Sequence, residues 1–372
     1  MNRLRISLVA VALALLFWAA SCGGPPEPRE PVGEAGHDAV VEPAPAPAPP
    51  PPGFNLVAAG DVMLDYLTAA RLRRYDPSYP FAAIAPLLKE GDLVFGNLEC
   101  PISDQGTPVQ KKYTFRAHPS AIDALAASGI NVVSLANNHI LDYGTIALED
   151  TLALLEKHDV AYAGAGHNEE EAREGAFFEI NGIKTAILAY SGVFVGTYPA
   201  WRAGPEKAGA LYYCDREQFI ADIEGVCRRA DVVIVSLHFG DEYTHRVSDE
   251  QREIARLAVD SGADLILGHH SHTPQGIEIY RDRPIIYSLG NFLFYPFSRA
   301  ICNETYILRA RIGRGGVESI NLLPVLLGDS QPYPATGREA ARLQELLGGL
   351  LDELGTPWEQ DGETLTVLPG PR

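Results

Sequence analysis

The chain has 372 residues, enough for one large domain or two ordinary ones, and 46% of them are hydrophobic, which allows a sizeable core. Its formal net charge of −18 argues against a nucleic-acid partner or an anionic membrane surface, because phosphate groups are bound by clustered Lys and Arg. The composition therefore favours an acidic globular protein.

Residues 1–22 have the pattern of an export signal. Arg3 and Arg5 precede an apolar run over residues 6–20, which is short for a membrane-spanning helix. The small residues before Cys22 resemble a bacterial lipoprotein signal, so we expect lipidation at Cys22 and a membrane-anchored protein facing the periplasm or the exterior. The alternative is an ordinary cleaved signal peptide with an incidental Cys.

Residues 23–53 form a predicted linker. Repeated Ala-Pro pairs and the Pro run over residues 49–52 favour an extended polyproline II segment, which cannot build a core. We expect a spacer between the lipid and a folded domain over residues 54–330. A C-terminal helix and tail follow over residues 331–372.

Predicted strands and helices alternate through the folded part. The first half predicts strands over residues 55–59, 93–96, 130–135 and 160–163, and helices over 64–75, 81–89, 119–128 and 145–158. A hairpin around Asn181-Gly182 comes next. The second half predicts helices over 215–229, 248–261 and 338–354, strands over 232–237, 265–267 and 284–288, and a hairpin around Gly315-Gly316. This order predicts an α/β fold with a largely parallel core and two mixed sheets.

Polar side chains follow several of these strands where each strand ends. They are Asp61, Glu99, Asn138, His139, His238, His270 and His272. Ligands of open α/β sheets bind beyond the carboxyl ends of the strands, so we expect these residues to converge. Each alone has a simpler explanation, such as a helix cap or a buried core histidine. Together, imidazoles, an amide and carboxylates suit one or two ions of Mn, Fe or Zn.

The loop over residues 134–144 is the centre of this pattern. An Asn amide next to an imidazole, with Asp142 three residues after His139, can bind a metal and also move a proton. An Asn-rich turn with a capping Asp is the alternative.

These residues form a set of motifs that resembles a known family. The motifs are Gly60-Asp61-Val62-Met63-Leu64, Asn97-Leu98-Glu99, Ala136-Asn137-Asn138-His139, Asp142-Tyr143-Gly144, His238-Phe239-Gly240-Asp241-Glu242-Tyr243, Gly268-His269-His270-Ser271-His272 and Ser288-Leu289-Gly290-Asn291-Phe292. They resemble the poly-γ-glutamate capsule-synthesis (CapA-type) family of the calcineurin-like metallophosphatase superfamily. The resemblance implies a four-layer αββα sandwich with two mixed sheets.

The resemblance also implies roles for single residues. Metal ligands would be Asp61, Glu99, Asn138, His238, His270 and His272. His139 would protonate a leaving group, oriented by Asp142. The superfamily's first-strand Asp-x-His is Asp61-Val62-Met63 here, and its metal-bridging Asp is Glu99, so one metal loses a ligand and the bridge is longer.

A basic loop and one asparagine are the predicted substrate contacts. Lys111, Lys112 and Arg116 fit an extended anionic polymer, although a solvated charge cluster explains them as well, and Asn291 belongs to the last motif. Cys100, Cys214, Cys227 and Cys302 allow two disulfides in three pairings, or none.

Three functions follow as hypotheses. The first is an exported, lipid-anchored protein that acts in poly-γ-glutamate or related surface-polymer biosynthesis through a metal-dependent hydrolase-like site. The second is a non-catalytic polymer-binding or export-scaffold protein with a vestigial metal site. The third is a metal-dependent phosphoesterase. The expected partners are an anionic polymer, the membrane through the lipid anchor, and membrane-bound polymer synthase subunits, with no nucleic acid.

Overall fold

The computed structural model describes residues 52–193 and 198–368. The predicted export signal, the lipidation site Cys22 and residues 23–51 of the predicted linker lie outside the described residues. Among the helices of the described ranges, none combines the length and the apolar character that a membrane span requires.

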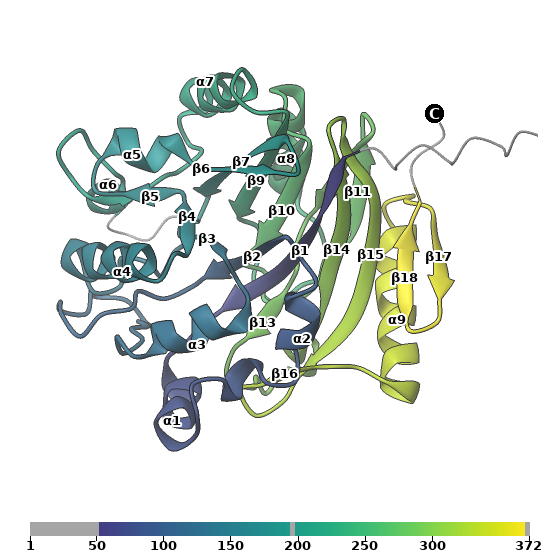
Figure 1. The fold of residues 1–372 in the computed structure, drawn as a ribbon, viewed down its shortest axis with the longest axis horizontal. Coiled ribbons are helices and arrows are strands. Elements are labelled where there is room, and N and C mark those ends of the chain that lie inside the picture. The colour runs from purple at the N-terminus through teal and green to yellow at the C-terminus, as the bar shows by residue number, and fades with distance from the viewer. Residues whose placement is uncertain (1–51, 194–197, 369–372) are drawn as a thin grey trace, which may run out of the picture. The chain divides into compact units, whose positions relative to one another are not determined.

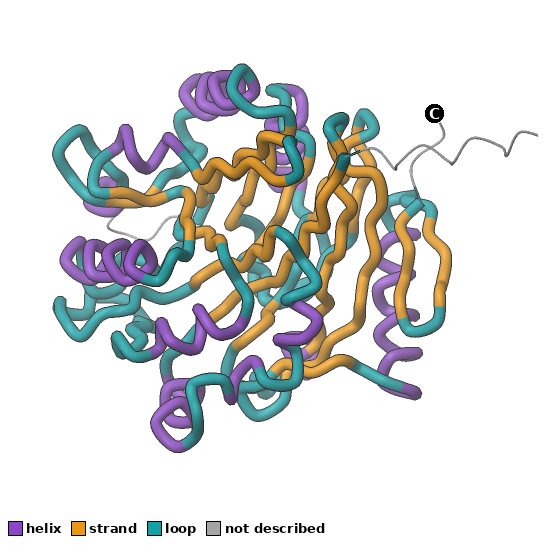
Figure 2. The backbone as a smooth tube through the Cα atoms, in the orientation of Figure 1, coloured by secondary structure: helices purple, strands orange, loops and turns teal. Residues whose placement is uncertain are grey.

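The larger of two mixed sheets has ten strands (Figures 1 and 2). Its strands follow the order β17-β18-β15-β14-β1-β2-β3-β4, while β13 pairs with β1 and β16 pairs with β15. Strands β4, β3, β2, β1 and β13 are parallel to their neighbours in that series. The bounds are β1 Gly53–Val62, β2 Leu93–Leu98, β3 Val132–Ser134, β4 Ala161–Ala163, β13 Asn291–Leu293, β14 Glu304–Gly313, β15 Gly316–Leu327, β16 Pro332–Pro334, β17 Trp358–Asp361 and β18 Thr364–Val367.

The second sheet has six strands in the order β11-β12-β10-β9-β7-β6. Its four inner strands are parallel, and the edge strands β6 and β11 are antiparallel to their neighbours. The bounds are β6 Ala176–Ile180, β7 Ile183–Ser191, β9 Val232–His238, β10 Leu265–His269, β11 Ile277–Tyr280 and β12 Arg283–Ile286, and a separate two-stranded sheet joins β5 Ala165–Gly166 to β8 Gly209–Ala210.

Helices cover the outer face of each large sheet. Apolar residues of α2, α3 and α4 share a core with the ten-stranded sheet, and those of α5, α7 and α8 share a core with the six-stranded sheet. A third core lies between the two sheets. This arrangement confirms the expected four-layer αββα sandwich. The helices are α1 Tyr66–Arg74, α2 Ala85–Leu88, α3 Ala121–Ser128, α4 Thr145–Lys157, α5 Glu169–Glu174, α6 Tyr198–Trp201, α7 Arg216–Cys227, α8 Asp249–Asp260 and α9 Gly337–Asp352, with 3-10 turns at Tyr79–Phe81 and Ala300–Asn303.

Strand β1 shows why the inner strands read as continuous apolar runs. Phe54, Leu56 and Ala58 pack between the sheets, whereas Val57 and Ala59 belong to the core under the helices. Successive side chains of a strand point to opposite faces, and both faces are covered here, so both sets must be apolar.

Local turn chemistry agrees with the sequence in two places. Asn181 and Gly182 join β6 to β7 with positive φ angles of 51° and 75°, the backbone that a tight hairpin requires. Ser248 and Gln251 form the expected capping box at the start of α8.

The C-terminal segment is more structured than the predicted helix and tail. Helix α9 places Leu347, Leu350 and Leu351 in the core between the sheets, and the hairpin of β17 and β18 extends the ten-stranded sheet beside β15. Three of the four residues of β17 are polar or charged, so the segment lacks the alternation of apolar and polar residues that predicts a strand. The cysteines at 100, 214, 227 and 302 form no disulfide with one another.

Candidate metal centre

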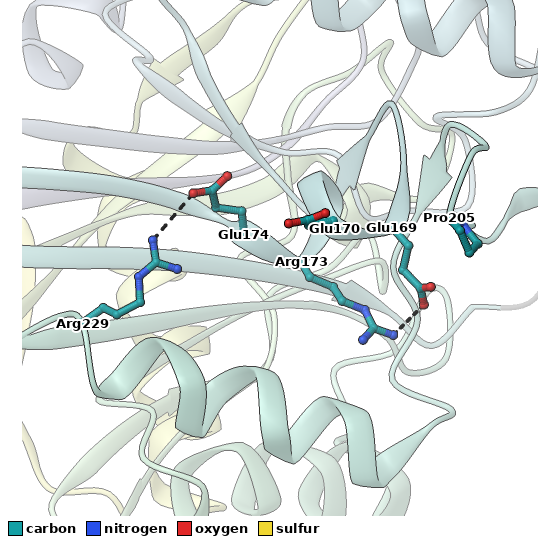
Figure 3. A pocket seen from close by; sticks show the side chains of 6 residues that line it. All are labelled: Glu169, Glu170, Arg173, Glu174, Pro205 and Arg229. Atoms are coloured by element: carbon teal, nitrogen blue, oxygen red, sulfur yellow. Dashed lines mark hydrogen bonds and ion pairs between the residues drawn. The ribbon is translucent and has the colours of Figure 1, made fainter.

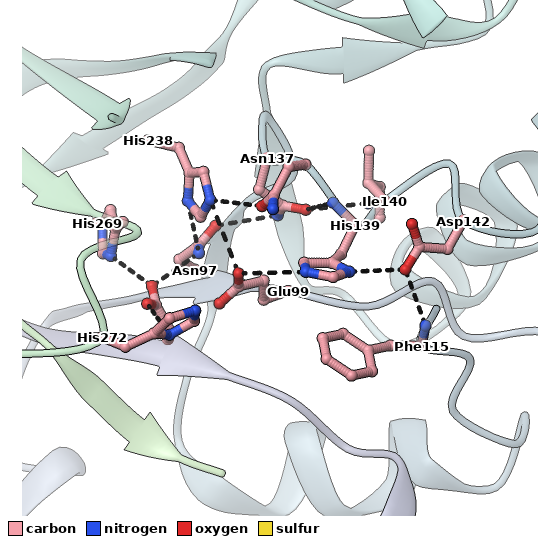
Figure 4. Close-up of polar contacts among 12 residues, drawn as sticks. Asn97, Glu99, Phe115, Asn137, His139, Ile140, Asp142, His238, His269 and His272 are labelled. Carbon is pink, nitrogen blue, oxygen red and sulfur yellow. Dashed lines mark hydrogen bonds and ion pairs between the residues drawn. The ribbon is translucent and has the colours of Figure 1, made fainter. Parts of the chain in front are cut away.

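The carboxyl ends of strands from both large sheets meet at the predicted site (Figure 4). In the ten-stranded sheet, Asp61 of β1 stands in register with Asn97 of β2 and with Asn291 of β13. In the six-stranded sheet, His238 of β9 stands beside His269 of β10. The polar residues are therefore neighbours because their strands are parallel and end together.

A close backbone approach fixes the position of Asp61. Its N–H donates a 2.9 Å hydrogen bond to the carbonyl of Gly290. A Cβ atom at Gly60 would lie 1.9 Å from that same carbonyl oxygen, so only glycine fits before Asp61.

Two fully buried carboxyl groups form the base of the site. Asp61 Oδ1 accepts a 2.9 Å hydrogen bond from Asn97 and lies 3.2 Å from His269 Nδ1, while Asp61 Oδ2 has no hydrogen-bond partner. Neither carboxyl oxygen of Glu99 has a hydrogen-bond partner. Buried polar atoms are almost always hydrogen-bonded, so these atoms mark a place that a ligand can occupy.

The two carboxyl groups differ in their charge. Burial raises the pKa of Glu99 well above its ordinary value, and the nearby Asp61 carboxylate raises it further. Burial also opposes ionisation of Asp61, but the contacts of its carboxylate with His269, His272 and Asn97 together outweigh burial and lower the pKa of Asp61. Burial and the neighbouring Asp61 carboxylate thus both favour the protonated form of Glu99.

Three imidazoles face the carboxyl groups. His238 Nε2 lies 2.8 Å from Asn138 Oδ1 and 3.7 Å from Glu99 Oε1. His272 Nδ1 lies 2.9 Å from Asn291 Oδ1, and His270 Nδ1 has no hydrogen-bond partner. Burial lowers the pKa of His238 well below its ordinary value and lowers the pKa of His270 to about 3. The rings of His238 and His270 are therefore neutral at pH 7, as a metal ligand must be.

The backbone around two of these imidazoles is strained. His270 and His272 have φ angles of 92° and 57°, in the left-handed region that costs a non-glycine residue about 1–3 kcal/mol. Such strain persists where the surrounding structure fixes it, and here it aims both rings at the same spot.

The ligand atoms fit a divalent cation. They form three overlapping groups, each with its atoms within 4.8 Å of one another, and the groups are Glu99-His238-His270, Asp61-Glu99-His272 and Glu242-His270-His272. Mixed nitrogen and oxygen donors with unpartnered buried atoms are the surroundings in which such a cation is held. The structure thus brings the predicted ligands together, while their roles as ligands stay predictions.

One carboxylate of this set was not assigned by sequence reasoning. Glu242 is exposed and follows β9 by several residues. In its motif, which begins at His238, the predicted metal ligand was the histidine. Only the fold shows that Glu242 approaches His270 and His272. Glu242 therefore joins the candidate ligands as an additional oxygen donor.

His139 stands beside the centre with two polar partners. Its Nδ1 lies 2.7 Å from Asp142 Oδ2 and 3.0 Å from Lys111 Nζ, and its Nε2 lies 4.0 Å from Glu99 Oε1. Phe115 covers the ring with centroids 4.1 Å apart and donates its N–H to Asp142. Burial lowers the pKa of His139 to about 4, so the ring is neutral at pH 7.

Asn137 organises the turn that carries His139. Its Oδ1 accepts hydrogen bonds of 3.0 Å from the N–H groups of His139 and Ile140. Its Nδ2 donates to Asn97 Oδ1 and to the carbonyl of Leu98. The Asn-rich turn expected as the alternative is therefore present. It orients the His139 imidazole beside the candidate metal centre.

The four predicted substrate contacts occupy different environments. Lys111 is mostly buried and donates to Asp142 Oδ1 at 2.8 Å and to the carbonyl of Asn138. Arg116 donates to the carbonyl of Gln105 at 2.8 Å. Asn291 is fully buried against His272 and donates to the carbonyl of Cys302. Lys112 is exposed. Their predicted contacts with substrate stay predictions.

Comparison with known proteins decides the family. A family model described as "Bacterial capsule synthesis protein PGA_cap" matches residues 55–296. The chain belongs to this bacterial capsule synthesis family.

Relatives in the family support the same assignment. The chain is 30% identical to the "Capsule biosynthesis protein CapA" of Bacillus anthracis over 76% of this chain and 69% of that protein. It is 28% identical to the "PGA biosynthesis protein CapA" of Bacillus subtilis (strain 168) over 82% of this chain and 80% of that protein. A "Probable polyglutamine synthesis accessory protein" of Mycobacterium tuberculosis is 32% identical over 54% of this chain and 55% of that protein.

A solved structure from Thermus thermophilus, that of TT1561, superposes with a TM-score of 0.40 at 11% identity, covering 70% of this chain and 99% of that chain. The family match includes every residue of the candidate centre, from Asp61 to Asn291.

Proposed function

We propose that this capsule synthesis family member acts in poly-γ-glutamate or related surface-polymer biosynthesis through a metal-dependent hydrolase-like site. The observation that carries the proposal is the set of buried polar atoms without partners. Asp61 Oδ2, both oxygens of Glu99 and His270 Nδ1 have no hydrogen-bond partner, and these three residues belong to overlapping groups of ligand atoms with further imidazoles. A cation there satisfies atoms that would otherwise destabilise the fold.

Asp61, Glu99, Asn138, His238, His270, His272 and the newly recognised Glu242 would hold the metal. When bound, the metal supplies Lewis-acid polarisation of a carbonyl or phosphoryl oxygen and lowers the pKa of water. His269 and Asn97 orient Asp61, while Asn291 orients His272, because each forms a polar contact with the ligand side chain.

His139 is the residue placed to move a proton. With its Nδ1 directed to Asp142, the neutral ring presents an unprotonated Nε2 toward the centre. Nε2 can accept a proton from an attacking water and then deliver it to the leaving group. For a γ-glutamyl amide, a carbon–oxygen bond forms, the carbon–nitrogen bond breaks, and the transferred proton neutralises the departing amine.

An assay panel on the metal-loaded full chain tests this function. It should compare γ-glutamyl peptides, poly-γ-glutamate and phosphate monoesters and diesters. We expect release of glutamate-containing products that requires metal and His139. Turnover of phosphate esters alone would show a phosphoesterase instead. Tight polymer binding with no turnover of any substrate would show the non-catalytic binding protein.

Export and lipid anchoring form the second part of the proposal. They rest on the sequence of residues 1–22, in which an apolar run and small residues precede Cys22. Cys22→Ala should release the protein from the membrane fraction or leave its signal uncleaved. A variant that fractionates and migrates like the wild type would contradict the anchor.

A further inference from the structure

A pocket of about 410 Å³ opens onto the candidate metal centre. His139 and His272 line it, so they belong both to the pocket and to the centre. Most of the remaining wall is aromatic, and it is formed by Tyr113, Phe115, Tyr243, Phe294, Tyr295 and Phe297. The wall comes from three separate parts of the chain, which the fold brings around one opening.

The aromatic residues of the pocket wall pack against one another. Phe297 stacks on Tyr295 with ring centroids 5.1 Å apart and lies 5.3 Å from Phe294. Phe294 meets the ring of His272 at 5.3 Å, and Phe115 covers His139. Because the rings support one another and the two histidines, an aromatic surface leads directly to the candidate metal centre.

Two cationic side chains, those of Lys112 and Arg299, line this pocket. Lys112 Nζ lies 4.9 Å from the ring centroid of Tyr113, and Arg299 Cζ lies 4.9 Å from that of Tyr243. Both side chains are exposed, and neither forms an ion pair with any residue in the described part of the chain. By contrast, Lys111 and Arg116 already donate to acceptors on nearby loops.

We infer that this pocket binds a segment of a polyanion whose carboxylates alternate with apolar stems, with Lys112 and Arg299 as the carboxylate-binding residues. A γ-linked glutamate chain has this character, since each unit carries a free α-carboxylate beside two methylene groups and a planar amide. The aromatic rings cover the methylenes and amides, and the two cations pair with carboxylates. This inference rests on the proposed function and names its substrate subsite.

Glu242 links the pocket to the metal centre. It lines the pocket, and its carboxylate oxygen lies within 4.8 Å of ligand atoms of His270 and His272. A negative charge at this position repels a polyanion until a cation neutralises it. Polymer affinity should therefore rise when the centre is loaded with metal, which couples substrate binding to metal binding.

The test measures binding of a labelled γ-linked glutamate oligomer to the full chain by fluorescence anisotropy, with and without Mn²⁺. Lys112→Gln and Arg299→Gln should each weaken binding about two- to fivefold, because each removes one solvent-exposed ion pair with the oligomer. Arg74→Gln is the matched control, since Arg74 is an exposed cation 5.3 Å from the Tyr75 ring and does not line the pocket. It should leave the affinity unchanged.

The outcomes separate this inference from the proposed function. Unchanged oligomer affinity in both variants, with metal content intact, would overturn the subsite while leaving the metal centre standing. Equal affinity for an α-linked glutamate oligomer, whose backbone contains no methylene groups, would overturn the claim that the aromatic rings cover backbone methylenes and amides. A wild-type chain that binds the γ-linked oligomer but takes up no metal would instead contradict the proposed function.

Discussion

Two clusters of ionisable residues differ in whether their polar atoms already have hydrogen-bond or ion-pair partners. The first is the candidate metal centre (Figure 4), and the second is a pocket of about 580 Å³ beside α5 (Figure 3). In the α5 pocket Arg173 pairs with Glu169 at 2.6 Å, and Arg229 pairs with Glu174 at 3.6 Å. At the metal centre, both oxygens of the buried Glu99 lack a hydrogen-bond partner.

This difference teaches that volume and charge alone do not identify a site. The α5 pocket is larger than the pocket at the centre, yet both of its arginines pair with glutamates near the surface, where such pairs are worth about 0–1 kcal/mol. The centre holds buried carboxyl and imidazole groups, and several of their polar atoms have no hydrogen-bond partner.

The largest expected effect follows removal of two imidazoles. His270→Ala combined with His272→Ala removes donors from all three ligand groups, so the full chain should lose its bound metal and any hydrolytic activity. Metal content by mass spectrometry measures this loss. The matched control is Glu174→Gln combined with Arg229→Gln in the α5 pocket, which should keep the wild-type metal content. Equal loss of metal in both double variants would contradict the distinction between the metal centre and the α5 pocket.

The next effect concerns catalysis without metal loss. His139→Ala should retain metal but slow turnover by about 10²–10⁴-fold, because the variant loses the proton carrier while the ligands remain. Measurement of kcat alongside metal content checks both statements. Wild-type turnover in this variant would remove His139 from the mechanism.

A stability effect follows from Lys111. Lys111→Met leaves the buried Asp142 carboxylate without its cation, and breaking such a pair costs about 3–5 kcal/mol of unfolding free energy. Lys112→Met is the neighbouring control, and its exposed side chain should change stability by no more than about 0.5 kcal/mol. Denaturant unfolding measures both. Similar stabilities for the two variants would show that the Lys111 contact is not a buried ion pair.

The smallest effect is a pH dependence caused by Glu99. Since its folded-state pKa is raised, its protonated form stabilises the metal-free fold below the ordinary value of 4.5, and this stability is lost as pH rises through the raised value. The thermal stability of the metal-free wild type should therefore fall with pH more than that of Glu99→Gln. Parallel pH profiles would contradict a buried protonated Glu99. Metal binding should release this proton.

Much of the centre was predictable because strand ends are visible in sequence. Asp61, Glu99 and His238 each follow an apolar run, and parallel strands that end together place such residues side by side. The inner strands were predictable for the same reason, since burial on both faces leaves a continuous apolar pattern. The four-layer sandwich followed from the set of motifs.

Other residues could not be found in this way because their roles depend on register or on distant loops. Asn97 acts on Asp61 only because β1 and β2 pair at that position. Glu242 and Arg299 are exposed, and their approach to the site arises from packing of separate loops. Strand β13 carries Asn291 but has only three residues, too few for an alternating pattern to show, so Asn291 was predicted from its motif and not from a strand end.

The central claim is that the buried centre, and not the α5 pocket, binds a divalent metal. Anomalous diffraction from crystals of the protein loaded with Mn²⁺ or Zn²⁺ locates the ion directly. We expect one or two peaks within bonding distance of Glu99, His238 and His270, and none in the α5 pocket. A metal-loaded crystal with no peak at the centre, or with its peak in the α5 pocket, would contradict this claim.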